Sequence, residues 1–170
     1  MTVTEGNIRY RFPAKFEALV GKLFKNSPGG SQGIFDTYVD IMVFAAAVGC
    51  AFEKRIEVDK FASKPEPIRE QIFDNDAGYL LVPSLMTFYA TDSIDLFDGT
   101  PQSADMRARV VEEYVCGGLS VIEERMKGEP DSNIPRILAS LIKEFIDDSE
   151  VNPSRPVLPG SDILGILQSD

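Results

Sequence analysis

The side chains best suited to reading DNA lie close to the N-terminus of the chain. Asn7, Arg9 and Arg11 alternate with three apolar residues, which is the period-two pattern of a short strand with one buried face. Arginine and asparagine form paired hydrogen bonds with the edges of guanine and adenine, so the polar face of such a strand suits base contacts. The pattern predicts a DNA-contacting segment formed by Asn7, Arg9, Arg11 and Lys15.

The order of the elements around this strand favours one particular DNA-binding module. A strand followed by two helices is the order found in ribbon-helix-helix proteins, in which two chains pair their strands and place the ribbon in the major groove. An eight-residue loop, NSPGGSQG, separates the two predicted helices and counts against that module. The alternative interpretation is an ordinary terminal segment with scattered arginines.

The distribution of charge limits how the chain could contact nucleic acid. The formal net charge is −10, but residues 1–30 carry five basic against two acidic side chains, whereas residues 92–150 carry six basic against fourteen acidic ones. Phosphate contacts supply most of the sequence-independent affinity for DNA, so an acidic protein binds it poorly alone. Tight DNA binding would require an oligomer or a protein partner, and the sequence leaves both open.

Two groups of carboxylates have spacings that invite a metal interpretation. Asp92, Asp95 and Asp98 are three residues apart, whereas an EF-hand loop needs ligands at alternate positions, so we expect a solvated acidic loop. Glu113 and Glu124 could share a helix face, but helical metal sites usually add histidine, and the chain has none. We therefore expect a charged outer helix face and no metal or other cofactor. A metal-dependent nuclease using Asp92, Asp95 or Glu113 is the alternative.

The composition excludes several classes of enzyme. Without histidine there is no Ser-His or Cys-His nucleophile, and no P-loop or GxGxxG sequence follows a predicted strand. Cys50 and Cys116 lie in apolar segments and are expected to be reduced, buried thiols. The N-terminus lacks an apolar signal segment, and no apolar run reaches the ~20 residues of a membrane span, so we expect a cytoplasmic protein without membrane contact.

The elements that must position these residues are mostly helices. Apolar periodicity predicts helices over 16–24, 35–48, 104–127 and 132–148, a core helix over 79–90, and a short helix after residue 66 with Ile68 and Ile72 facing inward. Met106 belongs to the predicted buried stripe of the longest helix, and Ile142 to that of the last. The sequence therefore predicts an all-α fold: a single-domain helical bundle of five to six helices over 1–150, with a short N-terminal strand and a weakly structured tail over 151–170.

Three glycines in the apolar helices have predicted roles of two kinds. Gly49 follows the predicted end of the second helix and suits a left-handed C-terminal cap. Gly117 and Gly118 interrupt the longest helix at a cost of about 1 kcal/mol each relative to alanine, which indicates close backbone packing or a kink. We expect the segment 33–49 to be the central element of the core, against which Gly117 and Gly118 pack.

Two segments resemble a known family. FDTYVDIMVFAAAVG matches the pattern F-x-T-Y-x-D-x-x-x-F-A-A-x-x-G, and EEYVCGGL matches E-E-Y-x-x-G-G-L; both patterns are similar to those of the small Dnd-associated accessory proteins of bacterial DNA phosphorothioation gene clusters. The matching residues are Phe35, Thr37, Tyr38, Asp40, Phe44, Ala45, Ala46 and Gly49, and then Glu112, Glu113, Tyr114, Gly117, Gly118 and Leu119. We interpret both patterns as structural, and the resemblance supplies no catalytic residue.

The resemblance implies a part in phosphorothioation-linked modification or restriction, and so in antiviral defence. Together with the lack of catalytic groups, it leads us to expect a non-enzymatic accessory protein. Its partners would be other proteins of a phosphorothioation or defence complex, with weak DNA contacts and self-association left open. A direct DNA-binding module of ribbon-helix-helix type and a carboxylate-dependent nuclease are the alternatives.

Overall fold

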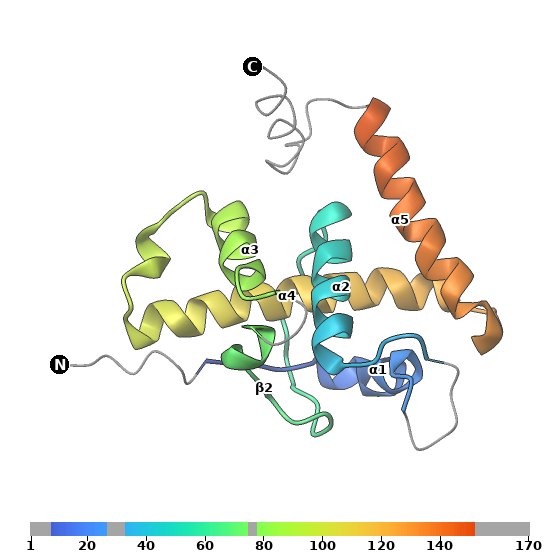
Figure 1. Ribbon diagram of the computed structural model, residues 1–170, viewed down its shortest axis with the longest axis horizontal. Coiled ribbons are helices and arrows are strands. Elements are labelled where there is room, and N and C mark those ends of the chain that lie inside the picture. The colour runs from blue at the N-terminus through green and yellow to red at the C-terminus, as the bar shows by residue number, and fades with distance from the viewer. Residues whose placement is uncertain (1–7, 27–32, 75–77, 152–170) are drawn as a thin grey trace, which may run out of the picture.

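The computed structural model describes residues 8–26, 33–74 and 78–151, and these residues are mostly helical (Figure 1). The predicted all-α class is confirmed, and the predicted tail over 151–170 lies almost entirely outside the described residues. The described helices and strands are β1 Arg9–Tyr10, η1 Ala14–Phe16, α1 Glu17–Leu23, α2 Tyr38–Ala51, β2 Ile68–Arg69, η2 Glu70–Asp74, α3 Val82–Thr91, η3 Asp95–Phe97, α4 Pro101–Met126, η4 Asp131–Asn133 and α5 Ile134–Val151, where η denotes a 3-10 helix.

The centre of the fold is the crossing of α2 over α4 (Figure 1). A Cβ atom on Gly118 would lie 1.7 Å from the carbonyl oxygen of Ala45, and one on Gly49 would lie 2.1 Å from that of Tyr114. The two helix backbones therefore touch at these two glycines, where any larger side chain would separate them. The predicted packing of Gly118 against the second helix is confirmed. The predicted cap role of Gly49 is wrong, because α2 continues to Ala51 and Gly49 is part of the crossing.

Gly117 contacts a different part of the chain from its neighbour. Its missing Cβ would lie 1.6 Å from the carbonyl oxygen of Lys54, in the loop that follows α2. The backbone N–H of Ile56 donates to the carbonyl of Glu113 at 3.1 Å and holds the same loop on α4. The glycine pair thus lets both α2 and the chain that leaves it lie directly on the longest helix.

The start of α2 depends on two residues of the first sequence pattern. The hydroxyl of Thr37 accepts a hydrogen bond from the backbone N–H of Asp40, and the Asp40 carboxylate accepts one from the backbone N–H of Thr37. This reciprocal capping box satisfies two N–H groups that an uncapped helix leaves unpaired. Of the three aromatic residues in the pattern, Tyr38 stacks on Phe24 with ring centroids 4.2 Å apart, and the rings of Phe35 and Phe44 have centroids 5.4 Å apart.

The predicted N-terminal strand is confirmed, and its partner comes from the same chain. β1 pairs antiparallel with β2, with Arg9 opposite Arg69 and Tyr10 opposite Ile68. Tyr10 is fully buried, and its ring packs edge-on against Phe73 with centroids 4.9 Å apart. The short helix predicted after residue 66 is therefore wrong in part, since Ile68 lies inward from a strand rather than from a helix.

Burial corrects three further expectations for apolar residues. Ile72 lies on η2 and is exposed, because Phe73 takes the inward position there. Met106 and Ile142 are also exposed, since the neighbouring elements do not cover these stretches of α4 and α5. The rest of the predicted stripe of α4 is buried, and the helix begins at Pro101 after a Thr100 cap, three residues before its predicted start.

Candidate functional site

A buried carboxylate lies in the middle of α4 and binds the chain just after β1. Glu112 is only 2% exposed. Its Oε1 accepts hydrogen bonds from the backbone N–H and from Nε of Arg11, both at 2.9 Å, and its Oε2 accepts one from Nη2 at 3.3 Å. The Arg11 guanidinium also lies 3.6 Å from the centre of the Phe61 ring. Burial raises the pKa of Glu112, and the hydrogen bonds from Arg11 act in the opposite direction.

The next residue of α4 forms a second ion pair of the same kind. Glu113 is 9% exposed, and its Oε2 accepts a hydrogen bond from Nε of Arg55 at 2.6 Å. Arg55 belongs to the loop that Gly117 allows to lie against α4. The charged outer face predicted for Glu113 and Glu124 is therefore wrong for Glu113, whereas Glu124 is exposed. Glu112 and Glu113 both lie under other parts of the chain, and each has an arginine partner.

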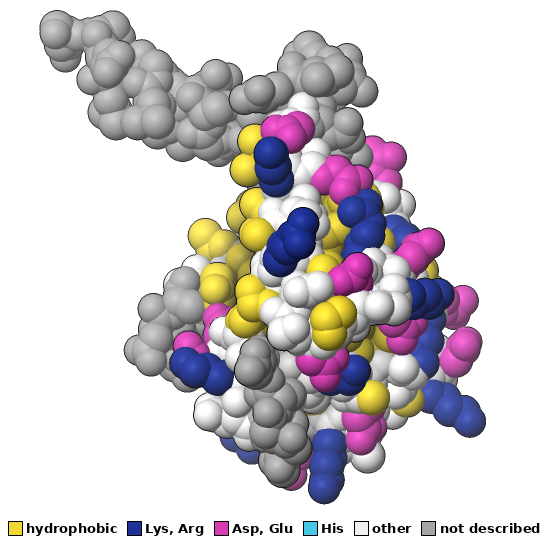
Figure 2. Space-filling view, turned by 90° about the vertical axis from the view of Figure 1, so that its right-hand side faces the viewer, with side chains coloured by type: hydrophobic (Ala, Val, Ile, Leu, Met, Phe, Trp, Pro, Cys, Tyr) yellow, Lys and Arg dark blue, Asp and Glu magenta, His cyan; other side chains and the backbone are white. Residues whose placement is uncertain are grey.

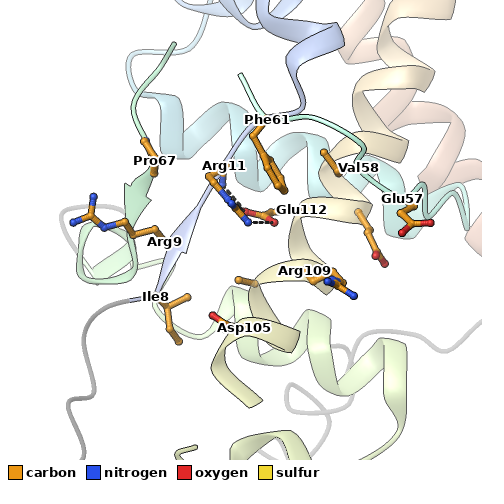
Figure 3. A pocket seen from close by; sticks show the side chains of 12 residues that line it. Ile8, Arg9, Arg11, Glu57, Val58, Phe61, Pro67, Asp105, Arg109 and Glu112 are labelled. Atoms are coloured by element: carbon orange, nitrogen blue, oxygen red, sulfur yellow. Dashed lines mark hydrogen bonds and ion pairs between the residues drawn. The ribbon is translucent and has the colours of Figure 1, made fainter. Parts of the chain in front are cut away.

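A pocket of about 620 Å³ opens beside these pairs, between β1, α4 and the loop that precedes β2 (Figure 3). Figure 3 shows the Arg11–Glu112 pair in its wall, below the Phe61 ring, whereas the side chain of Arg9 extends away from that pair. The residues that line the pocket are Ile8, Arg9, Arg11, Glu57, Val58, Phe61, Pro67, Asp105, Ala108, Arg109, Glu112 and Glu113. The lining thus carries four acidic and three basic side chains, with one aromatic ring.

Several reactive groups around the pocket are engaged or buried. The Glu112 carboxylate is already occupied by three donors, so it is poorly placed to take a proton from a substrate. The nearest thiol on α4, Cys116, is buried, and burial raises its pKa. Over the part of the chain that the structure describes, no three His, Cys, Asp or Glu side chains lie close enough together to hold a metal ion.

The structure brings together two of the four residues predicted to contact DNA. Arg9 and Arg11 both line the pocket, and both are exposed at the surface. Lys15 lies on η1 with its ammonium group 5.0 Å from the centre of the Phe16 ring, and it also interacts with the thiol of Cys116. Asn7 lies outside the described residues. DNA contact by this segment stays a prediction. The sequence did not indicate that the Arg11 guanidinium forms an ion pair with Glu112.

The residues of the two family patterns lie together at the helix crossing. Phe35, Thr37, Tyr38 and Asp40 form the entry to α2, whereas Glu113, Tyr114, Gly117 and Gly118 belong to α4. Of the pattern residues, Glu112 and Glu113 line the pocket. The patterns therefore mark the framework of the fold, and these two glutamates connect that framework to the pocket.

Sequence reasoning missed most of the pocket, although one signal was present. Glu112 and Glu113 sit inside a stretch of α4 in which the neighbours on both sides are apolar, VVEEYVCGGL. Charged residues in such a stretch are almost never buried unless they are paired, so the stretch could have predicted paired carboxylates. No local signal identifies Arg55, Glu57, Phe61 or Arg109, because their positions depend on how distant segments pack.

The fold and the pocket define a small helical protein in which paired charges hold distant segments onto one long helix beside a charged cavity. The chain belongs to the family of DNA sulphur modification system-associated protein 4, whose family model matches residues 9–154. The match spans α2 and α4 and so includes both sequence patterns, and it confirms the predicted Dnd-associated family. Neither the curated proteins nor the solved structures include a match to this chain. Among the described helices, none has the length and apolar character needed to cross a membrane.

Proposed function

We propose that this chain is a non-enzymatic accessory protein of a phosphorothioation-linked modification or restriction system, and that it acts by holding another protein of that system. The family name places such proteins beside DNA sulphur modification. The observation that carries the proposed mode of action is an exposed apolar surface on α3. A function through protein contacts requires a surface of this kind, because burying apolar side chains is the main source of binding free energy.

The surface on α3 has the spacing of a helix face that lacks a partner. Leu81, at the cap of α3, is 66% exposed, and Leu85, Phe88 and Tyr89 are exposed as well. Positions separated by three and four residues share one side of a helix, so these four side chains form one stripe. The helix itself, VPSLMTFYAT, contains no charged residue. Four large apolar side chains on one uncharged face are typical of a docking site.

The border of this surface indicates the charge of the partner. Asp92, Asp95 and Asp98 follow α3 and are all exposed, as the sequence predicted, and Ile94 lies among them with 73% of its surface exposed. The pKa of Asp98 is lowered, mainly by the hydrogen bond from the backbone N–H of Thr100, so this carboxylate stays ionised. The partner we propose is therefore an amphipathic segment with apolar anchors flanked by lysine or arginine.

A second copy of this chain fits the surface less well. The net charge of −10 would bring acidic surfaces together, and like charges across an interface oppose association. Figure 2 shows that the face on the α5 side carries acidic and basic side chains interspersed, so it offers no extended basic surface to match the aspartates. We therefore do not propose a second copy as the occupant of this surface, and light scattering would detect self-association.

The test is co-expression with the proteins of the same modification system. A double variant, Leu85→Ser with Phe88→Ser, should lose a partner that the unchanged chain retains through purification. The matched control is Ile142→Ser with Ile146→Ser, which removes two exposed apolar side chains from α5. Equal retention of the partner by both double variants would contradict the proposed surface, and light scattering would show whether the chain pairs with itself.

Direct DNA contact through Arg9, Arg11 and Lys15 is the second candidate function, and the exposure of all three residues favours it. The ribbon-helix-helix arrangement has less support, because one edge of β1 is taken by β2 of the same chain. The nuclease alternative has a simple test. DNA nicking by the pure protein with magnesium or manganese, abolished by substitution of Asp92, Asp95 or Glu113, would establish an enzyme and contradict the non-enzymatic role.

A further inference from the structure

Two arginines face each other across the small ribbon formed by β1 and β2. Arg9 and Arg69 are direct partners in the antiparallel register, and the next pair, Tyr10 and Ile68, is buried. Directly opposite residues lie on the same face of a ribbon, and successive residues alternate between faces. The two arginines therefore share the exposed face, with their Cα atoms opposite each other.

No described acidic group neutralises this pair. Within the described residues neither Arg9 nor Arg69 forms an ion pair, whereas Arg11, two positions further along the same face, is held by Glu112. The acid next to Arg69 is engaged elsewhere, since Glu70 accepts a hydrogen bond at 3.2 Å from the hydroxyl of the buried Tyr10. Like charges placed directly across two strands repel each other, so this arrangement favours an anion between them.

The charges of the neighbouring pocket determine where such an anion can lie. Glu57 and Asp105 line the pocket and oppose entry of a negative group, and they outnumber Arg109, the one lining arginine besides Arg9 and the paired Arg11. Arg9 lies on the rim, and Figure 3 shows its side chain directed away from the Arg11–Glu112 pair. The favourable position is therefore over the exposed face of the ribbon, outside the pocket.

We propose that Arg9 and Arg69 form a two-arginine site for a phosphate group, and that the group it takes is a backbone phosphate of DNA. A guanidinium presents a planar fork of donors that matches phosphate oxygens, and two of them can bind one group from both sides. Contacts of this kind position a protein on the duplex without reading its sequence. The inference deepens the second candidate function and does not depend on the α3 surface.

The first arm of the test measures binding of a short DNA duplex to the full chain as a function of salt. Removing the shared phosphate contact with Arg9→Gln and Arg69→Gln should weaken binding on the order of 10-fold near 0.1 M salt and make the salt slope shallower by about 1. The control is Arg136→Gln with Lys143→Gln, which removes the same charge from exposed positions on α5. Equal effects of the two double variants would overturn the site.

The second arm uses inorganic phosphate to test whether the arginine site binds phosphate, independently of DNA binding. Inorganic phosphate should raise the thermal midpoint of the unchanged chain and have no such effect on the variant Arg69→Glu. That variant places opposite charges across the ribbon, so its midpoint in phosphate-free buffer should be no lower than that of the unchanged chain. Loss of phosphate binding then cannot be ascribed to misfolding. Binding of phosphate without binding of DNA would support the arginine site and refute the DNA contact, whereas binding of neither would overturn the site.

Discussion

Glu112 accepts three hydrogen bonds from Arg11, a residue 101 positions away in the sequence. One bond comes from the backbone N–H and two come from the guanidinium, so both the backbone and the side chain of Arg11 are held. Because the carboxylate is buried in α4, this contact fixes the N-terminal segment to the middle of the longest helix. It also fixes the direction of β1 and thereby the face on which Arg9 lies.

We predict that Arg11 and Glu112 are energetically coupled. Arg11→Met leaves the buried carboxylate without its partner and should cost about 2–4 kcal/mol of unfolding free energy, less than for a fully buried pair because Arg11 is half exposed. Adding Glu112→Leu removes the unpaired charge and should restore part of that loss. Urea unfolding of the two single variants and the double variant gives the coupling energy. A double variant whose loss equals the sum of the two single losses would contradict the coupling.

The same carboxylate should give the protein a distinctive dependence on pH. Burial raises the pKa of Glu112 above its ordinary value of 4.5, so the folded state holds this proton more tightly than the unfolded state does. The contribution of Glu112 to stability is then fully present below the unfolded pKa and is lost as the pH rises through the folded pKa. Relative to Glu112→Gln, the unchanged chain should therefore lose stability as the pH rises above the ordinary pKa of 4.5.

The measurement is the difference in unfolding free energy between the unchanged chain and Glu112→Gln at several pH values. Glu123→Gln, at an exposed position on the same helix, is the control, because it makes the same change of charge without the burial. If the two variants show the same pH profile, the raised pKa of Glu112 has no part in the stability of the fold.

How far the sequence predicts this fold depends on whether the signal is local. The periodicity of apolar residues predicted α2, α4 and α5, and the alternation around Tyr10 predicted β1. The close packing at Gly118 is also a local signal, and it is confirmed. The failures at Ile72 and Met106 have one cause: an apolar side chain on a predicted face is buried only if another element covers it, and that depends on the tertiary arrangement.

The candidate site was harder to predict because it is assembled from distant segments. Arg11 and Arg55 reach adjacent positions of α4 from separate parts of the chain, and neither is distinguishable in the sequence from an ordinary surface arginine. Arg9 and Arg69 are likewise brought opposite each other by the register of β1 and β2. Strands of two residues are too short for the sequence to predict that register.

We predict that Gly118→Ala destabilises the fold severely although alanine favours helices. The added methyl would lie 1.7 Å from the backbone carbonyl of Ala45, and neither helix can move without disturbing the whole crossing. The expected loss is about 4 kcal/mol or more. Ser120→Ala, two residues further along α4 at a half-buried position, is the control and should be nearly neutral or slightly stabilising. Thermal unfolding measures both, and a Gly118→Ala protein as stable as the control would contradict the contact between α2 and α4.

We predict that the two thiols react slowly in the folded protein. Burial raises the pKa of Cys50 from 9.0 to about 12 and also raises that of Cys116, although Lys15 acts against the latter shift. Only the thiolate is alkylated, so at pH 8 the reactive fraction of Cys50 should be on the order of a thousandfold below that of an ordinary cysteine. Iodoacetamide labelling followed by intact mass measurement should leave the native chain unmodified over a period in which the urea-unfolded chain gains two adducts. Rapid modification of the native chain would contradict the raised thiol pKa, and labelling of Cys116→Ala would show whether the reacting thiol is the half-buried Cys50.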